Sequence, residues 1–279
     1  MIVVRTRDEL RAALADLPRP VGLVPTMGWL HAGHRSLFQR ARADDASTVA
    51  TIFVNPRQFN EAADYQRYPR NEARDIAICE EEGVDLVFVP DVEEVYPPGF
   101  DTTVSVGSIA RPLEGAARTG HFDGVATVVA ILFDLIGADH AYFGQKDAQQ
   151  VLVIRQMARD LAIRTAVIAC PTVREPDGLA LSSRNVHLSP EERAAAPVLR
   201  RALLAARERW EAGERSGEVL RSTMADEIGA ESLAIPAYVS VADGRTLAEL
   251  DRLPDAGPVL LSLAVRFGPT RLIDNEPLL

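Results

Sequence analysis

The fold is decided by the stretch VGLVPTMGWLHAGH, residues 21–34. Its first residues, Val21–Pro25, are apolar and typical of a strand buried on both faces, and a glycine-containing turn leads from them into an amphipathic segment, residues 33–46. In an open α/β sheet, ligands bind beyond the carboxyl ends of the strands, where a helix N-terminus offers unpaired N–H groups and a positive dipole to phosphate. The stretch therefore predicts a phosphate-binding strand–turn–helix unit.

Two histidines lie at this turn, His31 and His34. Residues three apart on a helix face the same side, so both side chains can donate hydrogen bonds to phosphate oxygens, while Gly28 lets the backbone approach a nucleotide. A zinc pair and two surface histidines are the alternatives. Zinc needs further ligands, whereas the turn already forms an anion site, so phosphate binding is favoured.

The same alternation of short apolar runs and longer amphipathic segments continues to about residue 170. We expect strands at Val21–Pro25, Thr48–Val54, Asp85–Val89, His140–Phe143 and Ile163–Ala169. Apolar residues spaced three and four apart predict helices between them, at Gly33–Ala46, Arg70–Glu82, Gly124–Ala138 and Asp147–Asp160. Strands joined by crossover helices form a mostly parallel sheet covered on both faces, so the first domain, residues 1–172, is predicted to be α/β.

A change of character after Pro171 predicts a second, smaller domain, residues 173–279. It opens with a loop rich in Arg, Asp, Gly and Ser, and Ser189-Pro190 then starts a helix, because proline suits the first helical turn. The expected elements are helices and then strands, which makes the domain α+β: Pro190–Glu211, Ser216–Gly229, Ala237–Val241 and Val259–Val265.

Net charge and local sequence patterns disfavour several classes of function. A formal charge of −10 opposes binding to nucleic acid, whose affinity depends on Lys and Arg contacts to phosphate. The apolar run Gly124–Phe133 is too short to cross a bilayer, so we expect a buried helix and no membrane partner. The N-terminal residues lack the apolar core of a signal peptide, which predicts a cytoplasmic protein. Cys79 and Cys170 show no metal-ligand spacing and are expected to pack as apolar residues.

Two further segments carry groups that suit phosphate. Phe143–Asp147 lies between an expected strand and an expected helix, where Lys146 offers a point charge and Asp147 a helix cap or a ribose acceptor. Gln150 projects one turn along the same helix. The loop segment Leu181–Asn185 (LSSRN) supplies two hydroxyls and a guanidinium. Taken alone, a solvated lysine and an ordinary helix cap stay open as alternatives.

Two other segments suit a small acid. Phe53–Phe59 ends the second expected strand and turns at Asn-Pro, which places the neutral amide of Gln58 near the same strand ends. Arg118 precedes the expected helix Gly124–Ala138, where its side chain can meet a carboxylate. A turn-stabilising glutamine and a surface arginine are the alternatives.

In this order, the five segments resemble the pantothenate synthetase family along nearly the whole chain. The turn His31-Ala32-Gly33-His34 is itself similar to the His-x-Gly-His signature of the nucleotidylyltransferase superfamily. The resemblance implies a homodimeric enzyme with a Rossmann-like N-terminal domain and a C-terminal lid. It further implies that ATP, with Mg²⁺, converts pantoate to pantoyl adenylate and releases pyrophosphate, and that β-alanine then displaces AMP.

The resemblance also assigns roles to residues. The catalytic group is expected to comprise His31, His34, Lys146 and Arg184. ATP contacts are expected from Met27, Gly28, His31, His34, Gly144, Lys146, Asp147, Val173, Leu181, Ser182, Ser183 and Arg184. Contacts to pantoate or β-alanine are expected from Pro25, Met27, Gln58, Arg118 and Gln150, and no residue is assigned to Mg²⁺.

The chain departs from the commonest family pattern at Arg57, Gln145 and Leu181. None of these removes a proposed catalytic group: leucine keeps the apolar volume of the usual methionine, and Arg57 is expected to face solvent. Another small-acid adenylate-forming ligase, another nucleotidyltransferase, or an ATP sensor without turnover are the alternative functions.

Overall fold

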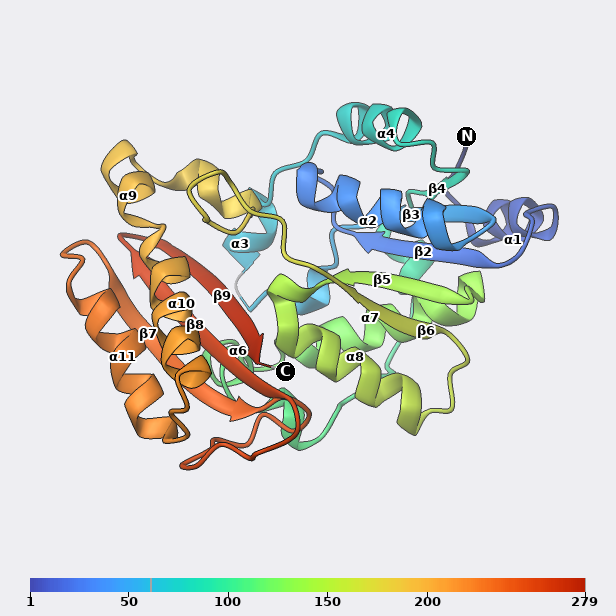
Figure 1. Ribbon diagram of the computed structural model, residues 1–279. Helices are drawn as coiled ribbons and strands as arrows, with labels where there is room; N and C mark the ends of the chain where they lie inside the picture. The colour runs from blue at the N-terminus through green and yellow to red at the C-terminus, as the bar shows by residue number, and fades with distance from the viewer. Residues whose placement is uncertain (61, 279) are drawn as a thin grey trace. The chain divides into compact units, whose positions relative to one another are not determined.

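The computed structural model describes residues 1–60 and 62–278, which form two compact units (Figure 1). The first unit comprises Met1–Gln145 and Gln149–Pro171, and the second comprises Lys146–Ala148 and Thr172–Leu279. Each unit has its own sheet and its own buried apolar core.

The first unit is built on a six-stranded sheet in which the strand pairings are parallel. The strands follow the order β1 (Ile2–Val4), β4 (Leu86–Phe88), β3 (Ser47–Ile52), β2 (Val21–Thr26), β5 (His140–Gly144) and β6 (Ala166–Cys170). The predicted parallel sheet is thus confirmed. From β2 the chain continues through β3 and β4 on one side and through β5 and β6 on the other, so the carboxyl ends of β2 and β5 mark the switch point where open α/β sheets bind ligands.

Helices cover both faces of this sheet (Figure 1). On one face lie α2 (Ala32–Asp44) and α4 (Glu72–Glu81), where Phe38 and Cys79 are buried with Val24 of the sheet. The other face carries α7 (His121–Ile136) and α8 (Ala148–Asp160), and α1 (Arg7–Ala15) packs against α7. Short elements complete the unit: η1 (Pro56–Gln58), α3 (Ala62–Arg67), α5 (Val92–Val95), η2 (Ser108–Ala110), α6 (Glu114–Ala117) and η3 (Gln145–Asp147).

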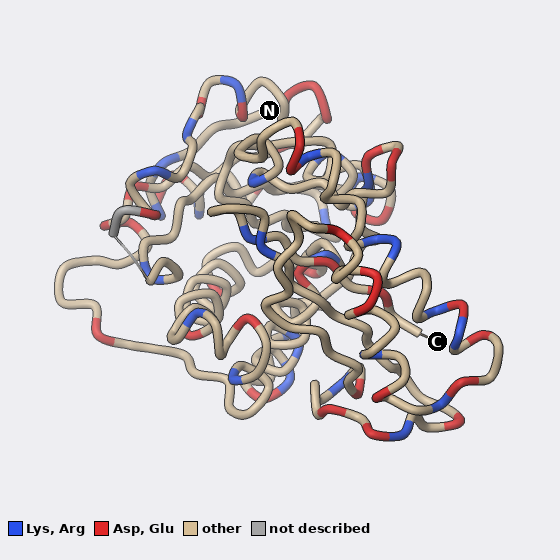
Figure 2. Tube along the Cα trace, turned by 90° about the vertical axis from the view of Figure 1, so that its left-hand side faces the viewer, with Lys and Arg blue, Asp and Glu red and all other residues tan. Residues whose placement is uncertain are grey.

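The structure bears on the expectations about the apolar run and about the two cysteines. The apolar run Gly124–Phe133 lies within α7 and is mostly buried, as predicted. Within the described part of the chain, no helix combines the length and hydropathy that crossing a membrane requires. Cys79 and Cys170 are free thiols packed in the core as predicted, and burial raises the pKa of Cys79 to about 12. Acidic and basic residues are interspersed along the chain (Figure 2).

The second unit is an antiparallel three-stranded sheet with two main helices packed on it (Figure 1). Its strands β7 (Ile235–Asp243), β8 (Val259–Phe267) and β9 (Thr270–Leu278) are neighbours in the order of the sequence. The helices α10 (Val198–Glu211) and α11 (Gly217–Gly229) bury Leu203 and Met224 in one core with Leu261 and Leu263 of β8. The α+β class of this part of the chain is confirmed.

The prediction of one helix over Pro190–Glu211 is wrong. The structure has two helices, α9 (Pro190–Ala195) and α10, and the chain between them contains Pro197. Proline has no N–H to continue the helical hydrogen bonds, and its ring clashes with a carbonyl of the preceding turn. The predicted helix start is correct, because Ser189 Oγ accepts from Glu192 N at 3.2 Å and the Glu192 side chain accepts from Ser189 N at 2.9 Å.

Candidate functional site

The turn after β2 is held by a carboxylate from another helix. Asp75 of α4 is buried and accepts hydrogen bonds from Trp29 N at 2.7 Å and from Leu30 N at 2.8 Å. Gly28 has a φ of 79°, and a Cβ there would lie 2.8 Å from Asp75 Oδ2, so the turn requires glycine. Arg74 donates to Leu30 O at 2.9 Å. Helix α4 thus fixes the backbone that leads into the histidine pair.

His31 and His34 cap the N-terminus of α2 with their rings. His31 Nδ1 accepts from Gly33 N at 3.1 Å, and His34 Nδ1 accepts from His31 N at 3.2 Å. Because Nδ1 is an acceptor in both rings, these hydrogen bonds assign the proton of each neutral imidazole to Nε2, from which it can be donated. The ring centroids lie 4.1 Å apart. The structure therefore brings the two histidines together at the positive end of a helix.

We expect the change Asp75→Asn to loosen this turn. The asparagine oxygen can still accept one backbone hydrogen bond, but its N–H₂ group faces the second N–H, and an unsatisfied buried group costs about 1–3 kcal/mol. Urea unfolding measures that loss. The variant is also expected to turn over more slowly, because the histidine pair directly follows the loosened turn.

The matched control for Asp75 lies on the same helix. Glu72 pairs with Arg5, and both side chains are about half exposed, so Glu72→Gln is expected to cost at most about 1 kcal/mol. Equal losses of stability and turnover in the Asp75→Asn and Glu72→Gln variants would contradict the role given to Asp75.

Gln58, which follows β3, lies in a buried hydrogen-bond network. Its Oε1 accepts from Asn55 Nδ2 at 3.0 Å, and its Nε2 lies 3.1 Å from the Met27 sulfur. Sulfur is a weak acceptor, so Nε2 can exchange this contact for a ligand oxygen. Asn55 in turn donates to Gly124 O at 3.1 Å and accepts from the Tyr96 hydroxyl at 2.8 Å. Burial raises the pKa of the Tyr96 phenol, which keeps the hydroxyl a donor.

Arg118 and His121 hold the backbone of Gln58. His121 Nδ1 donates to Gln58 O at 2.8 Å, Arg118 Nη2 donates to the same oxygen at 3.3 Å, and Arg118 Nη1 donates to His121 Nε2 at 3.2 Å. One neutral tautomer of His121, protonated on Nδ1, satisfies both of its contacts. The structure thus brings Met27, Gln58 and Arg118 together. Asn55 and His121 join them, and neither was assigned a role from the sequence.

The predicted phosphate ligands Lys146 and Ser182–Arg184 belong to the second unit. Lys146 lies in η3, with its Nζ 3.8 Å from Asp147 Oδ1 and its side chain 16% exposed. Ser182 caps η4 (Ser183–His187), where its hydroxyl accepts from Arg184 N at 3.2 Å. Leu181 N donates to Val173 O at 3.0 Å, so these two predicted ATP contacts are neighbours in the loop.

The other predicted residues lie in the first unit, near strand ends or at the start of a helix. Pro25 precedes the last residue of β2, Gly144 ends β5, and Gln150 is half-buried in the first turn of α8. The adjacent Gln149 has a structural part instead, because its buried Nε2 donates to two backbone carbonyls at 2.8 Å and 3.0 Å. Of the departures from the family pattern, Arg57 is exposed as expected and donates to a threonine hydroxyl at 2.8 Å.

Metal binding by a dedicated side-chain cluster finds no support in residues 1–60 and 62–278. No group of three or more His, Cys, Asp or Glu side chains is placed there to hold an ion. Within the same ranges, no such group of three or more includes the histidine pair. Mg²⁺ that is bound through nucleotide phosphates and water does not depend on such a cluster.

Comparison with known proteins finds relatives over the whole length. The family model described as pantoate-beta-alanine ligase matches residues 2–277. The chain is 59% identical over 275 residues to a pantothenate synthetase of Roseiflexus castenholzii, covering 99% of this chain and 98% of that protein. It is also 59% identical to a pantothenate synthetase of Chloroflexus aggregans over the full length of both.

Solved structures agree with these relatives. A pantothenate synthetase from Thermus thermophilus matches with a TM-score of 0.92 at 49% identity, covering 99% of both chains. A pantoate-beta-alanine ligase from Francisella tularensis, complexed with beta-gamma ATP and beta-alanine, matches with a TM-score of 0.79 at 33% identity, covering 99% of this chain and 97% of that one. The predicted fold is thereby confirmed at the level of the whole chain.

Proposed function

The chain belongs to the pantoate–β-alanine ligase family, and from that premise we propose that it joins pantoate to β-alanine in two steps. In the first step, a pantoate carboxylate oxygen attacks the α-phosphorus of ATP, a new O–P bond forms, and pyrophosphate leaves with the electron pair of the broken P–O bond. In the second step, the β-alanine amine attacks the acyl carbon of pantoyl adenylate. The amide bond forms, the amine loses a proton, and AMP leaves.

The observation that carries this proposal is the histidine pair at the N-terminus of α2. The first step brings two anions together and develops negative charge on the departing pyrophosphate, so it needs preorganised donors rather than a protein nucleophile. The Nε2–H groups of His31 and His34, with the helix dipole, supply such donors. We assign His34 to proton donation or charge stabilisation at the phosphate.

We assign the cluster around Gln58 to the two small substrates. The Gln58 amide contacts Met27 through a weak bond that a pantoate oxygen can replace. Pro25 lies near the end of β2, and Gln150 lies in the first turn of α8. Arg118, which is anchored on Gln58 O, is assigned to the β-alanine carboxylate. Asn55 and His121 hold this group in place and are added to the site as supporting residues.

The second unit is assigned to the nucleotide. Lys146, Ser182, Ser183 and Arg184 suit the triphosphate. Gly144, Asp147 and Val173 are assigned to adenosine, and Leu181 to ATP. The C-terminal domain, residues 173–279, is proposed to act as a lid that excludes water from the adenylate. Mg²⁺ would arrive with ATP, held by phosphate oxygens and water, and supply charge neutralisation. We also propose, from family membership, that the protein is a homodimer in the cytoplasm.

The test is release of AMP by the purified protein. With Mg²⁺ and ATP, we expect AMP to appear at a steady rate only when pantoate and β-alanine are both present, together with an equal amount of pantothenate. ATP binding without turnover would point to a sensor. Turnover with other small acids but not with pantoate would point to a different adenylate-forming ligase, and either result would reject the proposal.

A further inference from the structure

We propose that two neighbouring residues of β9, Asp274 and Asn275, are positioning residues for the phosphate-binding segments of the second unit. This inference rests on the proposed function, because Lys146 and Ser182–Arg184 are the segments concerned. β9 carries no residue that the sequence assigned to the site. Its side chains nevertheless contact Arg174, at the start of the loop that leads to Ser182–Arg184, and Lys146 itself.

Asn275 fixes the backbone of Lys146. Its side chain is buried, with the residue 4% exposed, and its Nδ2 donates to Lys146 O at 2.9 Å. Lys146 is the only lysine in the sequence. A lysine ammonium is a compact charge on a flexible four-carbon stem, so its placement depends on how firmly its own peptide is held. The short 3₁₀ turn η3 around Lys146 has inherently poor internal hydrogen bonds, and Asn275 supplies an external one.

Asp274 fixes the start of the loop that leads to Ser182–Arg184. Arg174 donates to Asp274 Oδ2 at 2.6 Å and to Asp274 Oδ1 at 3.0 Å, and Asn275 N donates to Oδ1 at 2.8 Å. The Asp274 side chain is 1% exposed, so its charge is compensated almost entirely by these donors. A two-pronged arginine–carboxylate pair sets orientation as well as distance.

Hydrogen bonds within the loop connect Arg174 to the segment that leads to Ser182. Arg174 Nη1 also donates to Gly178 O at 3.0 Å, and Arg174 pairs with Ala180 in an antiparallel bridge. Leu181 N then donates to Val173 O at 3.0 Å, which closes residues 173–181 into a short hairpin. The next residue is Ser182, the cap of η4. Asp274 therefore holds the base of the hairpin from which Ser182–Arg184 project.

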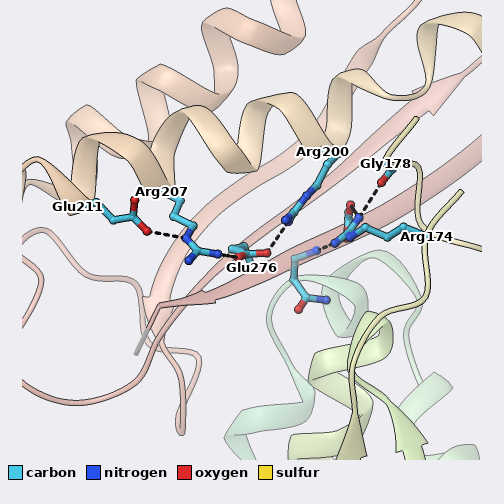
Figure 3. A network of polar contacts seen from close by, with 8 residues as sticks. Arg174, Gly178, Arg200, Arg207, Glu211 and Glu276 are labelled. Carbon is cyan, nitrogen blue, oxygen red and sulfur yellow. Dashed lines mark hydrogen bonds and ion pairs between the residues drawn. The ribbon is translucent and has the colours of Figure 1, made fainter. Parts of the chain in front are cut away.

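The same strand provides a matched control. Glu276, two residues beyond Asp274, accepts from Arg200 and, at 2.7 Å, from Arg207 (Figure 3). Both arginines lie on α10, which carries no residue assigned to the site. Glu276→Gln therefore removes ion pairs from the same strand and breaks no hydrogen bond of the hairpin or of Lys146.

The first measurement separates the two chemical steps in the full-length protein. Pantoate-dependent exchange between ATP and pyrophosphate reports adenylate formation, and conversion of supplied pantoyl adenylate with β-alanine reports amide formation. Asn275→Ala and Asp274→Asn are each expected to slow exchange by about tenfold or more, with conversion of the adenylate changed by less than about twofold. Glu276→Gln is expected to lower the unfolding temperature and to leave both rates unchanged.

The second measurement observes the hydrogen bond itself. Protein grown with lysine labelled with ¹³C at the carbonyl carbon gives one NMR signal, from the carbonyl that Asn275 binds. Loss of the donor is expected to move that signal upfield in Asn275→Ala and to leave it in place in Glu276→Gln. Asn275→Asp keeps the size of the side chain and removes the donor at neutral pH, and it replaces Asn275→Ala if that variant does not fold.

The outcomes distinguish the two proposals. No pantoate-dependent exchange by the wild-type protein would overturn the proposed function. Wild-type exchange together with an unchanged carbonyl signal, or with an unchanged exchange rate in Asn275→Ala, would overturn the positioning role alone. Equal slowing of both steps in all three variants would show a general loss of structure and would also overturn it.

Discussion

Replacing Lys146 by alanine is expected to slow the formation of pantoyl adenylate by about 10–150-fold, which corresponds to about 1.5–3 kcal/mol for one charge-assisted hydrogen bond. Its ion pair with Asp147 is a long one, with 3.8 Å between Nζ and Oδ1, so the ammonium can turn to a phosphate at little cost. In the proposed first step, the contact between Lys146 and phosphate would strengthen as negative charge develops on pyrophosphate, so we expect the loss to fall on the rate constant more than on ATP binding. Rapid quenching of a single turnover measures that rate constant.

The Lys146→Arg variant is the control for charge. Its guanidinium keeps the positive charge but has a planar, forked shape, so we expect a rate between those of the wild type and Lys146→Ala. Conversion of supplied pantoyl adenylate is expected to change little, because no pyrophosphate leaves in that step. A wild-type single-turnover rate in folded Lys146→Ala would remove this residue from the catalytic group.

The core of the fold was predictable because its signal is local. Val21–Pro25 is apolar throughout, Gly28 follows at the turn, and the amphipathic period begins near Gly33. Burial on both faces of a parallel strand and on one face of a helix leaves such patterns in any sequence. The parallel sheet and the family resemblance were confirmed on this basis. Helix α1 also has a local signal, because Thr6 and Glu9 form a capping box, but it was not predicted.

Strand β9 was not predictable from propensity. Its sequence, TRLIDNEPL, contains Asp274, Asn275 and Pro277, which are poor strand formers. Pairing with β8 and burial of Leu272 and Leu278 compensate for them, and both depend on tertiary structure. The polar residues that weaken the strand signal are the ones that bind Arg174 and Lys146.

The site residues likewise differ in whether they could be predicted from the sequence. His31 and His34 are close in sequence, so their pairing could be inferred from helical spacing. Asp75 lies 45 residues beyond Leu30, and an aspartate within an amphipathic helix carries no sign that it reaches a distant turn. Asn55 was read only as part of a turn. The roles given to the individual residues stay predictions until the variants are measured.

The Gly124→Ala change adds only one methyl group, but we expect it to disturb the hydrogen-bonded cluster around Gln58 more than that small addition suggests. A Cβ at Gly124 would lie 2.2 Å from Arg57 O and 2.7 Å from Gln58 N, and backbone atoms cannot move aside as a side chain can. Alanine gains about 0.5–1 kcal/mol of helix propensity, but forcing extra volume into a packed contact costs about 1–3 kcal/mol or more, so a net loss of stability follows. The segment Pro56–Gln58 must shift away from α7.

In the proposed function, that shift would affect the substrates through Gln58. Asn55 donates to Gly124 O at 3.1 Å and to Gln58 Oε1 at 3.0 Å, so moving the segment misaligns the Gln58 amide. A displacement of about 1 Å can cost about 100-fold, and we expect kcat/KM for pantoate to fall by that order. Gly229→Ala in α11 is the control, because among the described residues nothing outside its chain neighbours and the adjacent backbone of its own helix lies within 4 Å of the added Cβ. A Gly124→Ala variant with wild-type stability and kcat/KM would show that the tight packing of α7 on Pro56–Gln58 does not position Gln58.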